Sequence, residues 1–302
     1  MRRGHLLTKK KEFVFLIVGE TGVGKTAFLS LVANILSGRD HSRYETVHDS
    51  SNEVGGSQSG SQTKTAHAYE FRSLNGVTVR VLDTPGLADT RGMKYDQEHK
   101  ASIAKTIQEA VPVIDGVLIV TNGTNPRLSL TTDYALTTLS SIFPRSIKEN
   151  ITILFTMISN ALSFNFEMDS LPDCLQEVEP LMLDNPIALR RKYEEKRRTS
   201  QASVLRKLEK MVDKAHWDAV DVLADFFRWL DSREVQPTTI IVELYKSTRD
   251  IDRKIREALN RMDDAASRKK QLRNIELDMA TADRVGYPAL YLSANDTHHP
   301  FR

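Results

Sequence analysis

Apolar positions in the first half of the chain follow two alternating patterns. Continuous apolar runs occupy residues 13–18, 113–121 and 151–155, with few polar interruptions. Runs of this length predict strands that are buried on both faces of a sheet. After the first run, apolar residues recur at helical spacing from Ala27 to a stop at Gly38, a typical helix C-terminal cap. Strands that alternate with helices predict an α/β fold, with a mostly parallel sheet and helices on both of its faces.

A hairpin interrupts this parallel pattern early in the chain. Residues 66–74 and 77–82 read as strands, and Asn75 and Gly76 between them favour a tight two-residue turn. The second strand leads directly into the sequence Asp-Thr-Pro-Gly at residues 83–86. An antiparallel hairpin at this place is typical of small switch GTPases and argues against recombination and transport ATPases.

The segment between the first strand and the first helix reads Gly-Glu-Thr-Gly-Val-Gly-Lys-Thr, a complete phosphate loop. Its glycines let the backbone turn with the N–H groups inward, and the helix adds the positive end of its dipole. Lys25 is expected to reach the β- and γ-phosphates and to act in catalysis, while the Thr26 hydroxyl is expected to ligate Mg²⁺. The predicted nucleotide contacts in this stretch are Glu20, Thr21, Gly22, Val23, Gly24, Lys25, Thr26 and Ala27. The sequence therefore predicts a nucleoside triphosphate site.

Two later segments have the positions expected of nucleotide-sensing switches. Residues 39–62 are polar and lack periodicity, which predicts a long loop. We expect Thr63, in preference to Thr65, to close over Mg²⁺ and the γ-phosphate and to serve in catalysis. Asp83 is expected to hold Mg²⁺, usually through water, and the Gly86 N–H is expected to meet the γ-phosphate.

Two further positions concern hydrolysis and the choice of base. Leu87 stands where many small GTPases carry the glutamine that orients the attacking water, which predicts slow hydrolysis. After the strand at residues 151–155, a GTPase carries Thr/Asn-Lys-x-Asp, whose aspartate accepts two hydrogen bonds from guanine. Residues 156–160 instead read Thr-Met-Ile-Ser-Asn, without the lysine or the aspartate. The residues alone therefore leave the choice between GTP and ATP open.

Five stretches together resemble the AIG1/IAN-type (immunity-associated nucleotide-binding) GTPases: GETGVGKT, the loop ending in SQTKT, the Asn-Gly hairpin, DTPGLADTRG and the strand ILFT. These proteins are related to septins and Toc GTPases, and the resemblance covers roughly residues 11–166. It implies a three-layer G domain with GTP or GDP as ligand and Mg²⁺ as cofactor. It also implies homodimers formed through the G domain, and membrane action in some members.

The second half of the chain has a helical pattern. Residues 204–230 and 238–282 carry apolar residues at helical spacing, and the later stretch follows a heptad seam typical of a coiled coil. This seam is expected to pack on the earlier helix as a hairpin, in preference to pairing with another molecule. Residues 171–184 read as a connecting segment and residues 287–294 as a short strand. The predicted organisation is a G domain over 1–170, a helical extension or insertion over 171–284, and a short strand or tail over 285–302.

Composition bears on the partners and the cellular compartment of the protein. The 302 residues include 42 basic and 40 acidic side chains, and this net charge of +2 gives no field that favours nucleic acid. The single cysteine, Cys174, suits a reducing compartment, so we expect a cytoplasmic location. No apolar run is long enough to span a bilayer. Basic residues near the N-terminus leave contact with an acidic membrane surface open, although a solvated tail is favoured.

Two functions from different classes fit these features. The first is a Mg²⁺-dependent GTP-binding switch that hydrolyses GTP slowly, and the second is a nucleotide-dependent assembly scaffold with little turnover. An ATP-binding phosphate-loop protein is a third, weaker alternative, because the hairpin argues against it.

Overall fold

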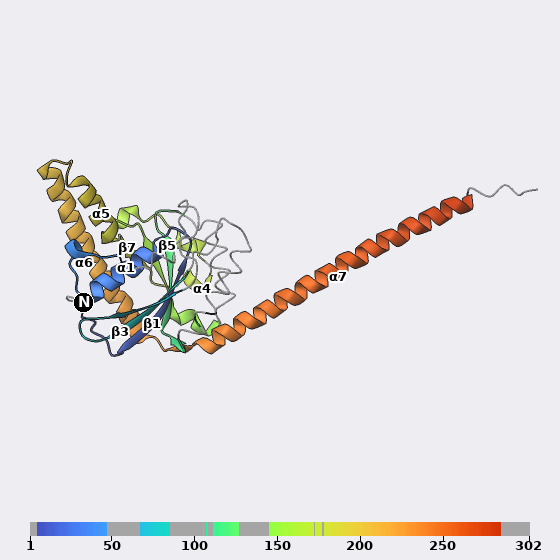
Figure 1. The fold of residues 1–302 in the computed structure, drawn as a ribbon, viewed down its shortest axis with the longest axis horizontal. Helices are drawn as coiled ribbons and strands as arrows, with labels where there is room; N and C mark the ends of the chain where they lie inside the picture. The colour runs from blue at the N-terminus through green and yellow to red at the C-terminus, as the bar shows by residue number, and fades with distance from the viewer. Residues whose placement is uncertain are drawn as a thin grey trace, which may run out of the picture. The chain divides into compact units, whose positions relative to one another are not determined.

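The chain forms two compact units, Met1–Thr248 and Arg249–Arg302. The computed structural model describes residues 5–46, 67–84, 105, 107, 111–126, 145–171, 173–176 and 178–284. In Figure 1 the first unit is a central sheet, with α1 (Lys25–Leu36) and α6 (Ala202–Ser232) beside it. This arrangement confirms the α/β class that the alternating pattern predicts.

The main sheet has six strands in the order β2-β3-β1-β5-β6-β7. All neighbouring strands are parallel except β2 and β3, which form the predicted antiparallel hairpin. The strands are β1 (Glu12–Gly19), β2 (His67–Arg72), β3 (Thr78–Asp83), β5 (Gly116–Asn122), β6 (Ile151–Thr156) and β7 (Leu181–Leu183). A separate two-stranded sheet pairs β4 (Val113–Ile114) with β8 (Gln236–Pro237).

The remaining described helices are short, apart from α5 and α7. They are α4 (Asp173–Gln176), α5 (Pro186–Lys196), α7 (Thr238–Arg284) and the 3-10 turns η1 (His41–Arg43), η3 (Arg145–Asn150), η4 (Ala161–Ser163) and η5 (Met168–Ser170). The Asn185 side chain accepts a hydrogen bond from the Ile187 N–H and so caps α5, while Pro186 takes the first helical position. Asn185 and Pro186 therefore fix where α5 begins.

The central strands β1, β5 and β6 are buried on both faces, which explains why they read as continuous apolar runs. Phe13 and Phe15 of β1 face α1 and α6, where the rings of Phe15 and Phe226 meet edge to face with centroids 4.9 Å apart. Val14 and Leu16 point to the opposite face and join a second cluster that includes residues of β5 and β6. The alternation along β1 therefore divides the core into two layers.

Two local details differ from the sequence-based expectation. The turn between β2 and β3 is a longer loop, in which the Gly76 N–H donates to Ser73 O and the Ser73 N–H donates to Val77 O. Gly76 has φ 83°, the left-handed value that closes such a bulged turn. The run at residues 113–121 is also broken, because Asp115 separates β4 from β5 and accepts a hydrogen bond from the Val14 N–H.

The compact unit extends beyond the boundary predicted at residue 170. The stretch read as a connecting segment contains β7, which adds the sixth strand beside β6. The apolar face of α6 is buried against the sheet through Leu223, Phe226 and Phe227. That face is therefore occupied within the first unit. The predicted packing of the later helix on α6 stays a prediction. The strand expected at residues 287–294 lies outside the described residues.

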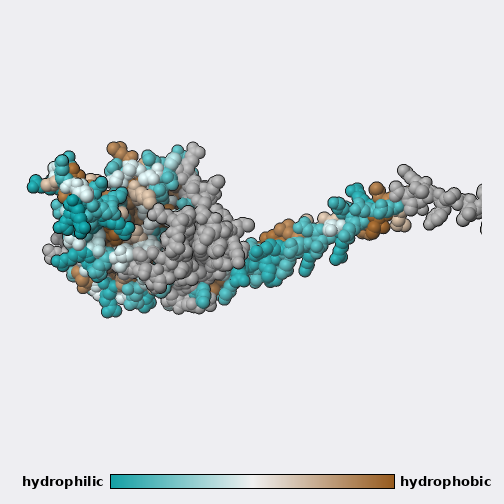
Figure 2. Space-filling model, turned by 45° about the horizontal axis from the view of Figure 1, so that its top comes forward, coloured by the Kyte–Doolittle hydropathy of each residue, from teal (hydrophilic) through white to brown (hydrophobic). Residues whose placement is uncertain are grey.

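The described part of the second unit is the continuation of α7, which agrees with the predicted long helix. Along this helix hydrophobic residues lie among hydrophilic ones, as Figure 2 shows. The exposed apolar residues are Ile251, Ile255, Leu259, Met262, Leu272, Ile275, Leu277 and Met279. Coiled-coil pairing of this stripe stays a prediction. Among the described helices, none has both the length and the apolarity to cross a membrane.

Candidate nucleotide site

The phosphate loop joins the end of β1 to the start of α1. Gly24 stands just before α1 with φ 97°, a left-handed conformation that an L side chain rarely adopts. Gly19 lies against β5, where an added Cβ would come within 2.2 Å of Val120 O. The two glycines therefore fix the path of the loop at both of its ends.

The N-terminus of α1 has no side-chain cap. The first N–H groups of a helix have no carbonyl partner inside the helix, and the helix dipole adds a partial positive charge there. The first hydrogen bond within the helix runs from the Phe28 N–H to Gly24 O at 2.9 Å. The N–H groups of Lys25, Thr26 and Ala27 thus precede it, and this geometry suits an anion such as a phosphate.

Lys25 turns back over the loop. Its Nζ donates to Gly19 O at 3.0 Å and to Glu20 O at 2.8 Å. Burial lowers the pKa of Lys25 to about 8, while the charges of Asp83 and Glu20 act in the opposite direction. An ammonium group held in this position can exchange its carbonyl acceptors for phosphate oxygens, whose negative charge would raise the lowered pKa of Lys25 again.

Asp83 is the last residue of β3 and is buried beside β1 at the level of Ile17. The neighbouring Thr84 hydroxyl donates to Ile17 O at 2.7 Å and ties the strand end to β1. The Thr21 hydroxyl in the phosphate loop is buried, and no hydrogen-bond partner for it exists among the described residues. A buried carboxylate, a buried hydroxyl and the α1 N-terminus therefore lie at one edge of the sheet, which fits Mg²⁺ with a polyphosphate.

The loop after β6 is anchored to the phosphate loop. The Thr156 hydroxyl contacts Val23 O at 2.8 Å and Thr121 O at 3.1 Å. Met157, which follows, has φ 64° and turns the chain away from the sheet. The position of the guanine-recognition motif thus holds a buried structural threonine and, at residues 158–160, no carboxylate.

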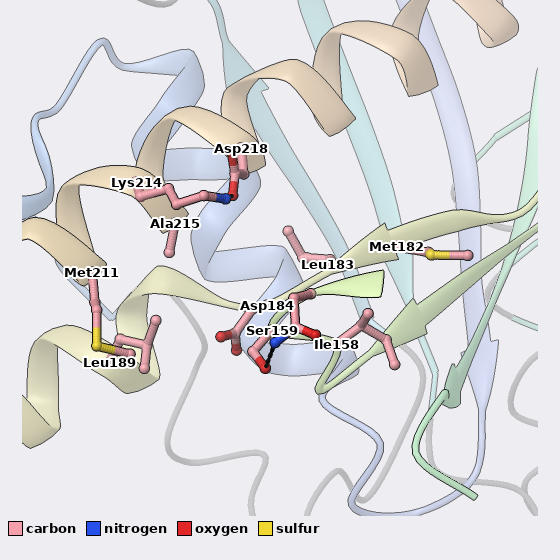
Figure 3. A pocket seen from close by; sticks show the side chains of 11 residues that line it. Ile158, Ser159, Met182, Leu183, Asp184, Leu189, Met211, Lys214, Ala215 and Asp218 are labelled. Carbon is pink, nitrogen blue, oxygen red and sulfur yellow. Dashed lines mark hydrogen bonds and ion pairs between the residues drawn. The ribbon is translucent and has the colours of Figure 1, made fainter. Parts of the chain in front are cut away.

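A cavity of about 320 Å³ opens beside this loop. Figure 3 shows side chains from the loop after β6, from the end of β7, and from α5 and α6 around it. Its lining includes Ser159, Asn160, Asp184, Lys214 and Asp218. The sequence reasoning missed Asp184 because it placed this residue in a connecting segment. The apolar triplet of β7 followed by Asp-Asn-Pro was the available signal for a strand end with a helix start behind it.

Comparison with known proteins gives the family of this chain. The AIG1 family profile matches residues 14–221, more than half of the chain. The chain belongs to the AIG1 family. A comparison with curated protein sequences finds no significant match.

Solved structures similar to this AIG1 protein include two of Toc33 from Arabidopsis thaliana. The complex with GDP and Mg²⁺ is 19% identical, with 70% of this chain and 68% of that chain covered and a TM-score of 0.36. The complex with Mg²⁺ and GMPPNP is 16% identical, with 74% and 87% covered and a TM-score of 0.42. The FeoB G-domain from Methanococcus jannaschii is 15% identical, with 68% and 99% covered and a TM-score of 0.34.

The structure of this AIG1 protein places part of the predicted site. The phosphate loop, Thr26 at the start of α1, and Asp83 lie at the same edge of the sheet, where β1 and β3 end in parallel. Thr63 and Gly86 lie outside the described residues, so their expected roles at Mg²⁺ and the γ-phosphate stay predictions.

Proposed function

We propose that this AIG1-family protein is a Mg²⁺-dependent GTP-binding switch that hydrolyses GTP slowly. The observation that carries the proposal is the uncapped N-terminus of α1, with the Lys25 ammonium folded over the loop in front of it. Family membership supports a G domain. The residues proposed to contact the nucleotide are Glu20, Thr21, Gly22, Val23, Gly24, Lys25, Thr26, Ala27, Asp83 and Gly86.

The chain's own residues would act mainly by position and charge. Lys25 would move its hydrogen bonds from two loop carbonyls to the β- and γ-phosphate oxygens and offset the charge that develops during hydrolysis. Thr26 and Thr63 would hold Mg²⁺ directly, and Asp83 would hold it through water. When bound, Mg²⁺ neutralises phosphate charge.

Slow hydrolysis rests on Leu87, which follows Asp-Thr-Pro-Gly in place of a glutamine. An aliphatic side chain cannot orient an attacking water by hydrogen bonding. Thr63 and Gly86 would sense the γ-phosphate and release their segments when it is lost.

A second function, a scaffold that assembles when nucleotide binds, is favoured by the exposed apolar stripe of α7. In this case the partner would be a second copy, through the helices or through the G domain. We also propose a cytoplasmic location, which rests on the single cysteine of the chain.

Turnover of GTP measured at rising protein concentration separates the switch from the scaffold. A specific rate that rises with concentration supports dimer-activated hydrolysis, and oligomers that keep GTP intact support the scaffold.

The central test is GTP affinity with and without Mg²⁺. Lys25→Ala is expected to reduce GTP affinity by at least tenfold, because a charge-assisted contact to phosphate contributes about 1.5–3 kcal/mol. Lys207→Ala, which removes an exposed ammonium on α6, is the matched control and should bind GTP as the unchanged protein does. Equal affinity of Lys25→Ala and the unchanged protein would show that the loop does not hold phosphate.

A further inference from the structure

The cavity beside the loop after β6 brings together two strand ends. Residues 158–160 follow β6, and Asp184 follows β7, the neighbouring parallel strand. The Ile158 N–H donates to Leu183 O at 3.4 Å and joins the two segments directly. In open α/β sheets, ligands bind outside the carboxyl ends of the strands, and this cavity lies there.

The cavity is also tied to the phosphate loop. Thr156, at the end of β6, reaches Val23 O in the phosphate loop at 2.8 Å. A Cβ added to Gly24 would lie 4.0 Å from the Thr156 methyl carbon. Thr156 contacts the phosphate loop and Ile158 lines the cavity, and only one residue lies between them in the chain. A nucleotide with its phosphates on the α1 N-terminus could extend its base towards this cavity.

Two carboxylates line the cavity, and they differ in their partners. Asp218 forms an ion pair with Lys214 one turn earlier on α6. Asp184 accepts no hydrogen bond and forms no ion pair within the part of the chain that the structure describes. Figure 3 shows its carboxylate pointing into the space between Ser159 and Leu189. Burial raises the pKa of Asp184, while the charge of Lys192 opposes the shift. This arrangement favours a ligand that offers hydrogen-bond donors.

We propose that Asp184 is the residue that selects guanine in this protein, in place of the aspartate that residues 156–160 lack. This inference rests on the proposed GTP-binding function. Guanine presents two adjacent donors, N1–H and the 2-amino group, which match the two oxygens of one carboxylate. Adenine presents a lone pair at N1, which a carboxylate repels. The specificity thus moves from the loop after β6 to the end of β7.

The test compares base preference in Asp184→Asn with the unchanged protein. The ligands are GDP, ADP and xanthosine diphosphate (XDP), which carries an oxygen in place of the 2-amino group, and affinities are measured by calorimetry with Mg²⁺. The asparagine oxygen accepts from N1–H and its amide donates to the xanthine oxygen. Asp184→Asn should therefore lose about 10- to 150-fold in GDP affinity and bind XDP more tightly than GDP. Asp184→Ala should lose GDP affinity without gaining XDP affinity.

Asp218→Asn is the matched control, because it makes the same change in the other cavity carboxylate, and it should keep the GDP preference. Three results would overturn the inference: a GDP preference unchanged in Asp184→Asn, a switch to XDP in Asp218→Asn, or an unchanged protein that prefers ADP. If Lys25→Ala still loses GTP while Asp184→Asn keeps its GDP preference, the proposed function stands and this inference alone falls. If the unchanged protein binds neither GTP nor GDP, both fall.

Discussion

The contact of Thr156 with the phosphate loop can be tested by a change that keeps shape and removes one hydrogen bond. Thr156 is 6% exposed, and its hydroxyl lies 2.8 Å from Val23 O and 3.1 Å from Thr121 O. A hydroxyl has one hydrogen and serves one carbonyl at a time. Thr156→Val therefore removes the equivalent of one buried hydrogen bond, which costs about 1–1.5 kcal/mol. Because the volume is kept, no cavity adds to this cost.

Two measurements follow from this magnitude. The midpoint of thermal unfolding should fall by about 2–6 °C, since 1 kcal/mol shifts a unit of this size by about 2–4 °C. The lost hydrogen bond also helps to hold Val23 in the conformation of the phosphate loop. If up to about 1 kcal/mol must be supplied to restore that conformation on binding, GDP affinity should fall by up to about fivefold.

Thr156→Ser supplies the matched control. It keeps the hydroxyl and removes the methyl group, so it should lose about 0.5–1.5 kcal/mol of stability and keep its GDP affinity. The reasoning would be refuted if the serine variant lost affinity while the valine variant bound GDP like the unchanged protein.

Two further predictions concern charge and packing. Because the pKa of Lys25 is lowered from 10.5 to about 8, the unfolded chain binds more protons between these values, and the nucleotide-free protein should gain stability as pH rises through this window. This gain in the free energy of unfolding is at most about 3 kcal/mol. Urea unfolding at pH 8 and pH 10 should show the gain in the unchanged protein and not in Lys25→Met. An equal gain in both proteins would contradict the assignment of the effect to Lys25. Phe226→Ala should lower the free energy of unfolding by about 3–5 kcal/mol, because the ring is 1% exposed and packs on Phe15. Trp217→Ala, at a site 57% exposed, is the control and should change it by less than about 1 kcal/mol, so similar losses would count against the packing argument.

The sheet and the phosphate loop could be predicted because their signals are local. The strands β1, β5 and β6 bury both faces, so the apolar run alone marks each of them. The phosphate loop needs particular residue types at a fixed spacing, and the turns at Gly24 and Gly76 show the positive φ values that only glycine adopts easily.

The end of the sheet could not be predicted in the same way. β7 has three residues, shorter than the runs that indicate a strand, and it becomes a strand because β6 offers an edge beside it. Asp184 gains its place in the cavity only through this pairing, since the residues around it come from the loop after β6 and from α6. Helical spacing in α6 likewise shows that one face is buried but does not say against what.

The position of α6 explains how the cavity beside the loop after β6 can keep its shape. The later part of α6 is fixed in the core, where Phe226 and Phe227 pack on the rings of β1. The earlier part of the same helix lines the cavity with Lys214, Ala215 and Asp218. A continuous helix transmits its fixed position along its length, so these side chains are held by packing three turns away and not by the ligand. The cavity wall on this side is therefore formed before any ligand binds, which keeps the ordering cost of binding low.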